Sequence, residues 1–425
     1  MEETRLYKGY WWLPSSEEEQ VAGMLTIESN GTLRLELYGC FGTEEKFLDF
    51  DKEDENVIWG RCYAPNGHMK DIALFECRPA ISYNFSSGFP IVRYSCRYAL
   101  IGFHTDSMSS PSFFEAQIDY EELAYWCPPK NISISYNNSS TTIALDRSKE
   151  RETLASISLD GGIKLSLKQG FSYIPEYPKV NIDQATYVEV AKEGLSGLDA
   201  ISAARKFEKF LSLAMLSPVE HGKIMLRSRN CYQDMNNGEH YYHSIELVTY
   251  LYNGEKTPQK KKPDLLFKYD DVGSVLESMY AKFCIEKRMA QIWSNLIDSL
   301  EKKRVFTSND FLVVIQALDG FSIRFRKEQD FLLQITALRD EFKDVRRIKL
   351  TDDDLKRAKG SRHYYSHILK LEEKEKKNAI EGANLFDLTR KLRVLLICCA
   401  LNFLGFDNTK INEMLYKCRN SILRV

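Results

Sequence analysis

The segment Ala155-Ser-Ile-Ser-Leu-Asp-Gly-Gly-Ile-Lys-Leu-Ser-Leu167 decides the fold of the larger part of the chain. Apolar and polar residues alternate on both sides of Asp160-Gly161-Gly162, and this is the period of a half-buried strand. A short turn of Asp and Gly between two such runs is typical of a β-hairpin. The segment therefore predicts two adjacent antiparallel strands.

The same pattern recurs upstream. Asn30-Gly31 precedes the alternating run Leu33-Arg-Leu-Glu-Leu37, and Asn66-Gly67 separates strands expected at 57–63 and 70–77. Further strands are expected at 223–227 and 244–252. Repeated hairpins predict an antiparallel sheet, built as a sandwich or an open barrel.

One helix is expected within this β-rich part, between Ser196 as its N-cap and Pro218 just beyond its end. His240 and His243 lie further on, and we interpret this pair as structural because no third ligand completes a metal site. The helix is predicted from apolar residues at helical spacing, which are Leu198, Ile201, Ala204, Phe207, Leu211 and Ala214.

The chain changes character after Lys256-Thr-Pro-Gln-Lys-Lys-Lys-Pro263, which has two prolines, no apolar residue and the composition of a linker. Every later segment has helical periodicity, including one apolar stripe from Val275 to Leu300. Short connections between such helices predict an antiparallel bundle. The predicted fold is therefore α+β, with a β-rich domain at 1–260 and an all-α domain at 261–425.

Ser361-Arg-His-Tyr-Tyr-Ser-His367 is the segment of the bundle that could carry chemistry. Gly360 and Ser361 are expected to break one helix and cap the next, which places Arg362 in a first turn. His367 would follow at roughly 7.5 Å of rise and about 140° of rotation. The arginine stem is long enough to bring its guanidinium toward the imidazole.

An arginine followed by a histidine after four to six intervening residues occurs four times in the chain, so the helical context decides between the occurrences. Only the last of four such pairs is followed by a helical run with helices on both sides. The four pairs are Arg61/His68, Arg97/His104, Arg357/His363 and Arg362/His367.

The segment 362–367 resembles the Arg-polar-x-x-x-His signature of HEPN ribonucleases, although His363 stands where asparagine is more usual. The segments 311–321, 9–14, 21–25 and 114–126 resemble the ApeA branch of that superfamily, a group of bacterial phage-defence proteins. The resemblance implies a homodimer whose two motif helices face one cleft. It also implies RNA as substrate, with transfer RNA the first to test, and a β-rich half that responds to an unknown phage trigger.

RNA carries its own nucleophile, the 2′-hydroxyl, so its cleavage needs proton transfer and a cation at the phosphate rather than a metal or other cofactor. Histidine titrates near neutrality, and arginine offers a fork of donors to phosphate oxygens. We therefore expect His367 to move the proton and Arg362 to bind the phosphate, with His363 orienting it. Candidates for RNA contact are Arg346, Arg347, Lys349 and Tyr364, the last by stacking on a base or by packing in the dimer.

Two other interpretations remain open. Arg362 and His367 could stabilise a dimer that only binds and regulates. Alternatively, His363 and His367 at i, i+4 spacing could hold a metal ion, although the glutamate of the usual motif is missing.

Charge is distributed unevenly along the chain. The residues from Lys261 onward include 32 Lys+Arg against 24 Asp+Glu, although the whole chain has a formal net charge of −2. A basic motif-bearing part is suited to phosphate.

The ten cysteines have no Cys-x-x-Cys spacing, and we find neither a signal peptide nor an apolar run long enough for a bilayer. These features predict a cytoplasmic protein that does not enter a membrane.

Overall fold

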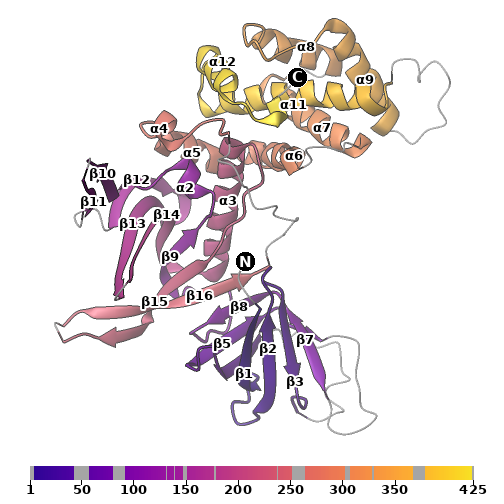
Figure 1. Ribbon diagram of the computed structural model, residues 1–425. Helices are drawn as coiled ribbons and strands as arrows, with labels where there is room; N and C mark the ends of the chain where they lie inside the picture. The colour runs from indigo at the N-terminus through magenta and orange to yellow at the C-terminus, as the bar shows by residue number, and fades with distance from the viewer. Residues whose placement is uncertain are drawn as a thin grey trace.

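The computed structural model describes residues 4–42, 57–79, 91–130, 132–137, 139–146, 151–176, 179–236, 238–250, 264–301, 307–327, 330–366 and 379–423. A β-rich part is followed by a helical part that lies at one end of it (Figure 1). This arrangement confirms the predicted α+β class.

One antiparallel sheet dominates the β-rich part, with the strand order β12-β13-β14-β9-β15-β16-β8-β5-β4-β1-β2-β3-β7-β6. Two further strands, β10 and β11, form a separate ribbon. The strands are β1 (Arg5–Trp12), β2 (Val21–Ile27), β3 (Leu33–Leu37), β4 (Val57–Tyr63), β5 (Met69–Phe75), β6 (Arg78–Pro79), β7 (Val92–Cys96), β8 (Tyr98–Ile101), β9 (Phe113–Asp119), β10 (Ile132–Tyr136), β11 (Thr141–Leu145), β12 (Arg151–Leu159), β13 (Ile163–Glu176), β14 (Lys179–Leu195), β15 (Ile224–Asp234) and β16 (His240–Thr249).

The three predicted hairpins are confirmed. Leu159 pairs with Ile163 across the Asp-Gly-Gly turn, where Gly161 and Gly162 have positive φ. β2 pairs with β3, and β4 pairs with β5. The two later strands are longer than expected, so that His240 and His243 lie within β16.

The sheet has two hydrophobic cores. One lies among β1–β5, β7 and β8 and includes Trp11, Leu25 and Ile58. The other packs the second half of the sheet against α3 (Gly197–Met215) and continues into the helical part. α3 begins at Ser196, whose hydroxyl accepts from the backbone N–H of Asp199 while the Asp199 carboxylate accepts from the backbone of Ser196. This capping box explains why the predicted inserted helix forms there.

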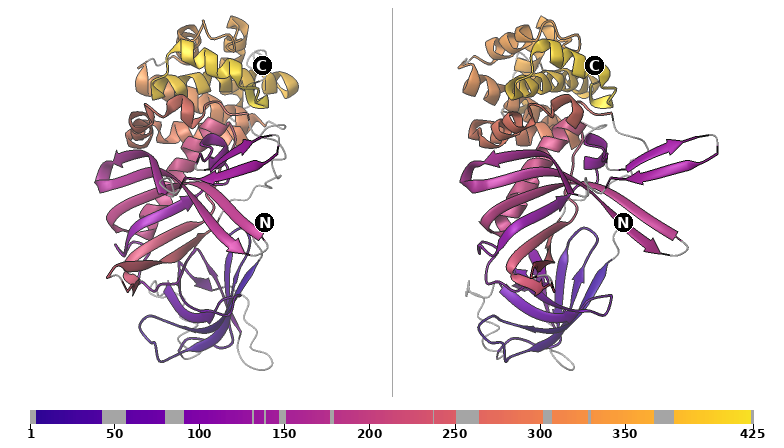
Figure 2. Two further views of the ribbon diagram at one scale, coloured as in Figure 1. Left: turned by 60° about the vertical axis from the view of Figure 1, so that its left-hand side comes forward. Right: turned by 90° about the vertical axis from the view of Figure 1, so that its left-hand side faces the viewer.

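The helical part packs on α3, and Figure 2 shows it covering one end of the β-rich part. Its helices are α4 (Tyr269–Val272), α5 (Leu276–Ile285), α6 (Ala290–Glu301), α7 (Ser308–Phe325), α8 (Phe331–Glu341), α9 (Asp352–Ser366), α11 (Gly382–Leu404) and α12 (Asn408–Lys417). The Tyr280 ring on α5 lies 5.6 Å from Phe207 and 5.2 Å from Phe210 on α3. The expected domain boundary at 260/261 and the linker fall in 251–263, outside the described residues, so that division stays a prediction.

Two local predictions about helices were wrong. The stripe from Val275 to Leu300 belongs to two helices, α5 and α6, joined by a 3-10 turn at Lys287–Met289. The second error concerns Gly360, because α9 continues through it as one helix. Ser361 is therefore no N-cap, and Arg362 lies near the end of α9 instead of in a first turn.

Candidate functional site

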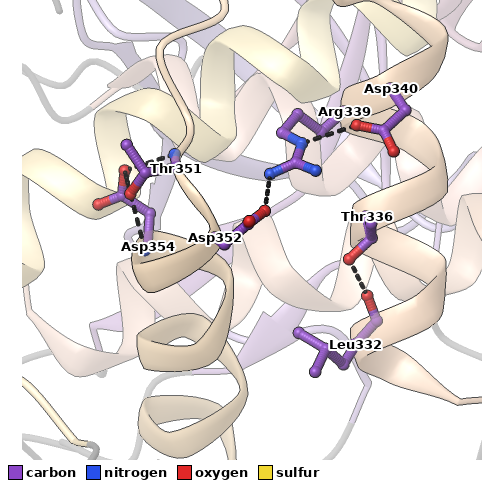
Figure 3. Close-up of polar contacts among 7 residues, drawn as sticks. All are labelled: Leu332, Thr336, Arg339, Asp340, Thr351, Asp352 and Asp354. Carbon is purple, nitrogen blue, oxygen red and sulfur yellow. Dashed lines mark hydrogen bonds and ion pairs between the residues drawn. The ribbon is translucent and has the colours of Figure 1, made fainter.

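The start of α9 is fixed by its own side chains. The backbone N–H of Thr351 donates to the Asp354 carboxylate at 2.9 Å, and the N–H of Asp354 donates to the Thr351 hydroxyl at 3.1 Å (Figure 3). Asp354 also pairs with Lys391 on α11 at 2.9 Å. These bonds satisfy donors that would otherwise be unpaired in the first turn, and they attach α9 to its neighbour.

Arg339 connects α8 to the same end of α9. Its guanidinium donates to Asp340 on α8 and to Asp352 at the start of α9 (Figure 3). Bonding to Arg339 lowers the pKa of the Asp352 carboxyl, so the carboxylate stays charged near neutral pH. These contacts fix the first turn of α9, which is N-terminal to the motif.

Arg362 lies between two other helices. One terminal nitrogen, Nη2, donates to the carboxylate of Asp319 on α7 at 2.7 Å, and the guanidinium carbon lies 4.6 Å from the ring centre of Phe331 on α8. The Asp319 side chain is 18% exposed and that of Arg362 is 39% exposed. Arg362 is therefore oriented on one side by a charge and a ring, and it stays accessible to solvent on the other.

The backbone beyond the motif is attached to α9 as well. The Ser361 hydroxyl is fully buried and accepts from the backbone N–H of Ile380 at 3.1 Å. The Tyr365 hydroxyl donates to the Ile380 carbonyl at 3.0 Å. Two side chains of α9, on either side of the motif arginine, thus hold the same residue just before α11.

The remaining motif residues differ in what the structure shows. His363 is exposed on α9, and Tyr364 is half-buried with its ring 4.9 Å from the Tyr365 ring. Packing is the contact seen for Tyr364. His367 lies outside the described residues, so its distance to Arg362 stays untested.

The predicted RNA-contacting residues before α9 fall into two groups. Arg346 and Lys349 are exposed, and the backbone N–H of Arg346 donates to Asn412 on α12. Arg347 is half-buried and donates to the carbonyls of Leu423 at 2.7 Å and Cys418 at 3.3 Å. These contacts make Arg347 a support for the end of the chain. Arg362 lies ten positions after Asp352 on α9, which is a rise of about 15 Å along the helix.

Sequence reasoning missed the partners of Arg362. Asp319 lies in the segment 311–321 that resembles the family. Its contact with Arg362 could not be predicted because the two residues are 43 positions apart in the sequence. A single carboxylate inside the apolar run Gln316-Ala-Leu-Asp-Gly-Phe321 was the available signal. Burial of charge usually requires such a pairing.

Four general findings concern metal ligands, membrane spans, disulfides and the ionisation of cysteine thiols. Among the residues that the structure describes, no three His, Cys, Asp or Glu side chains lie close enough to hold a metal ion, and no helix is long and apolar enough to cross a membrane. The ten cysteines are all described and form no disulfide. Burial raises the pKa of the thiols of Cys62 and Cys127 to about 12, so both stay protonated.

Comparison with known families agrees with the motif and with the two-part fold. Residues 6–283 match the model of ApeA N-terminal domain 1, and residues 322–410 match the model of the Apea-like HEPN domain. No curated protein and no solved structure matches the chain. The second match includes Arg362, and the first covers well over half of the chain. The chain therefore belongs to the ApeA family, defence proteins with a HEPN domain of the nuclease type.

Proposed function

We propose that this protein is an endoribonuclease of phage defence that cleaves RNA without a metal ion. The observation that supports the proposal best is the setting of Arg362 in a HEPN domain. Its guanidinium is oriented by Asp319 and Phe331 and remains 39% exposed. A positioned and accessible guanidinium is suited to the phosphate that gains charge during cleavage.

The proposed reaction starts at the 2′-hydroxyl of the RNA. The His367 imidazole accepts the hydroxyl proton, the oxygen attacks the adjacent phosphorus, and the bond to the 5′-oxygen breaks as that oxygen takes a proton from His367 of the partner subunit, which acts as the acid. Arg362 stabilises the charge on the phosphate oxygens. The products are a 2′,3′-cyclic phosphate and a 5′-hydroxyl, and DNA is resistant because it has no 2′-hydroxyl.

A second copy of the chain completes the proposed site. Acid–base catalysis by one group supplies a factor of about 10²–10⁴, whereas enzymes commonly reach about 10⁶ or more. A homodimer with facing α9 helices supplies two arginines and two histidines to one phosphate. His363 is exposed beside Arg362, and we assign it the orientation of that phosphate.

Contacts along the RNA are assigned to the exposed side chains. Arg346 and Lys349 follow the backbone, while Arg347 contributes mainly by holding the segment in place. Tyr364 packs or stacks at the dimer cleft. Transfer RNA is the first substrate to test, the cytoplasm is the expected compartment, and the β-rich half is the proposed sensor of a phage trigger.

The deciding experiment incubates purified protein with RNA in excess EDTA. We expect wild type to yield 2′,3′-cyclic phosphate ends, and we expect His367→Ala and Arg362→Ala to lose at least about a hundredfold in rate. Arg357→Ala is the matched control, because this arginine is also exposed on α9 and forms a local ion pair with Asp353 at 2.7 Å. Equal activity of all variants, or activity only without EDTA, contradicts the proposal.

The alternative of a non-catalytic dimer is separated by phage challenge in cells. We expect wild type to protect, and both motif variants to give no protection at equal protein levels. Protection by all of them, with no RNA cleavage in the EDTA assay, would instead favour a binding and regulatory role.

A further inference from the structure

The ribbon of β10 and β11 is amphipathic, and its apolar face is open. Ile132 pairs with Leu145, Ile134 with Ile143, and Tyr136 with Thr141. Alternate residues of a strand point to the same face, so these six share one side of the ribbon. The exposed fractions are 53% for Ile134, 77% for Tyr136 and 53% for Ile143.

The edges of the ribbon are open too. Among the described residues no third strand pairs with β10 or β11, and the right-hand view of Figure 2 shows the ribbon projecting from the large sheet. The sequence from Asn131 to Leu145 has no charged residue and no proline. Charges and prolines are the usual means of protecting an exposed edge. A two-stranded ribbon is also marginally stable alone, so packing on this face would stabilise it.

The chain just before the ribbon, at Pro128 and Lys130, is held by contacts with its neighbours. The Gln169 side chain accepts from the backbone N–H of Lys130 at 3.1 Å and donates to the carbonyl of Pro128 at 3.0 Å. Lys130 pairs with Asp270 on α4 at 3.0 Å. The neighbouring Tyr269 donates to the Leu154 carbonyl of β12 at 2.9 Å. The ribbon thus projects from the point where the helical part begins.

We propose that this ribbon binds an extended, uncharged peptide segment of a partner protein, which adds at one edge as a third strand and places its alternate apolar side chains beside those of the ribbon, so that the apolar face continues across the new strand. The open edges offer backbone donors and acceptors for such a strand. The inference concerns binding alone and does not depend on RNA cleavage.

The size of the face supports a peptide over a second copy of the chain. Five residues per strand and two strands give roughly 17 Å by 10 Å, or on the order of 200 Å². A stable interface between proteins buries about 800 Å² on each side. A strand of five or six residues matches the available face.

The polarity of the tip supports a peptide over a lipid surface. The turn between the strands holds Asn137, whose side chain accepts from the backbone N–H groups of Ser139 and Ser140 at 3.0 Å and 2.7 Å. Membrane-inserting segments instead place apolar side chains at the membrane and basic ones at its surface. No basic residue lies between Asn131 and Leu145.

The test uses the full-length protein and a labelled, capped eight-residue peptide of alternating Val and Thr, followed by fluorescence anisotropy. We expect saturable binding by wild type and roughly tenfold or greater weakening by Ile134→Asp. Ser133→Asp is the matched control, because this neighbour lies on the opposite face, and its binding should change by less than about twofold. A probe with every backbone nitrogen methylated should not bind, because it has no N–H donor left on either edge to pair with the ribbon.

Four results would overturn the proposal. The first is that wild type does not bind the peptide saturably, and the second is that Ile134→Asp and Ser133→Asp weaken peptide binding equally. The third is that the methylated probe binds as well as the unmethylated one. The fourth is evidence that a second copy of the chain or a membrane binds the ribbon in place of a peptide. Sedimentation showing that Ile134→Asp separates a wild-type dimer would identify a second copy as the occupant. Binding of wild type but not Ile134→Asp to neutral phosphatidylcholine vesicles would identify a membrane.

Discussion

The carboxylate of Asp319 on α7 accepts a hydrogen bond from Arg362 on α9 at 2.7 Å, and it is the less exposed of the two side chains. The pair joins two helices that carry different parts of the proposed site. A carboxylate in this position can orient the guanidinium while leaving its outer donors for a phosphate. Asp319 is thus a positioning residue in the proposed mechanism.

Replacing Asp319 by Asn keeps the shape of the side chain and removes its charge. We expect kcat for RNA cleavage to fall about tenfold to a hundredfold with a much smaller change in KM, because Arg362 loses its orientation rather than its affinity. Asp319→Glu should recover part of the rate. The control is Asp353→Asn, which removes the partner of Arg357 on the same helix. A faster Asp319→Asn enzyme would show that the carboxylate restrains Arg362 instead.

Arg347 and Arg346 should respond differently to alanine. Arg347→Ala removes two bonds to the carbonyls of Leu423 and Cys418, so we expect the free energy of unfolding to fall by about 1–3 kcal/mol in denaturant titrations. Arg346→Ala should leave stability within about 0.5 kcal/mol and reduce the salt dependence of RNA binding by about one phosphate contact. If Arg347→Ala instead left stability unchanged and reduced the salt dependence of RNA binding, Arg347 would be assigned to RNA contact.

Ser361→Ala should weaken the attachment of Ile380. The substitution leaves the Ile380 N–H without its buried acceptor, which costs on the order of 1–2 kcal/mol of unfolding free energy. Tyr365→Phe removes the bond to the Ile380 carbonyl. Because both side chains hold one residue, their effects in a double-mutant cycle should not add. Strict additivity, measured by denaturant unfolding, would argue against a shared anchor.

Stability should decrease in acid partly through Asp354. Burial raises the pKa of this carboxyl, but hydrogen bonds from Lys391 and Thr351 outweigh burial, so the pKa is lowered overall. A lowered folded-state pKa stabilises the fold above the unfolded value, near 4, and this stabilisation is lost as the pH falls through the folded-state value. Asp354→Asn should therefore lose stability at pH 7 and show a smaller further loss at pH 3. The exposed Asp387, replaced by Asn, serves as the control.

Local patterns in the sequence predicted much of the fold. The Asn-Gly and Asp-Gly turns identified hairpins because positive φ favours glycine there, and Ser196 identified the start of α3. The predicted helix break at Gly360 was wrong because contacts of other residues stabilise the helix there. These contacts are the cap at Thr351 and the hydrogen bond between Ser361 and Ile380. Asp319 could not be assigned for the same reason, since its partner is distant in sequence. Non-local contacts decided both points.

The aromatic contact of Tyr280 with Phe207 and Phe210 has a consequence for release of the helical half. A protease that cut the chain between α3 and α5 would leave these rings packed together, and the two pieces would stay associated. A helical fragment produced alone would expose the Tyr280 face to water and be prone to aggregate. For the proposed nuclease, activation by a phage trigger would therefore require rearrangement while the two parts stay packed together, rather than release of a separate helical domain.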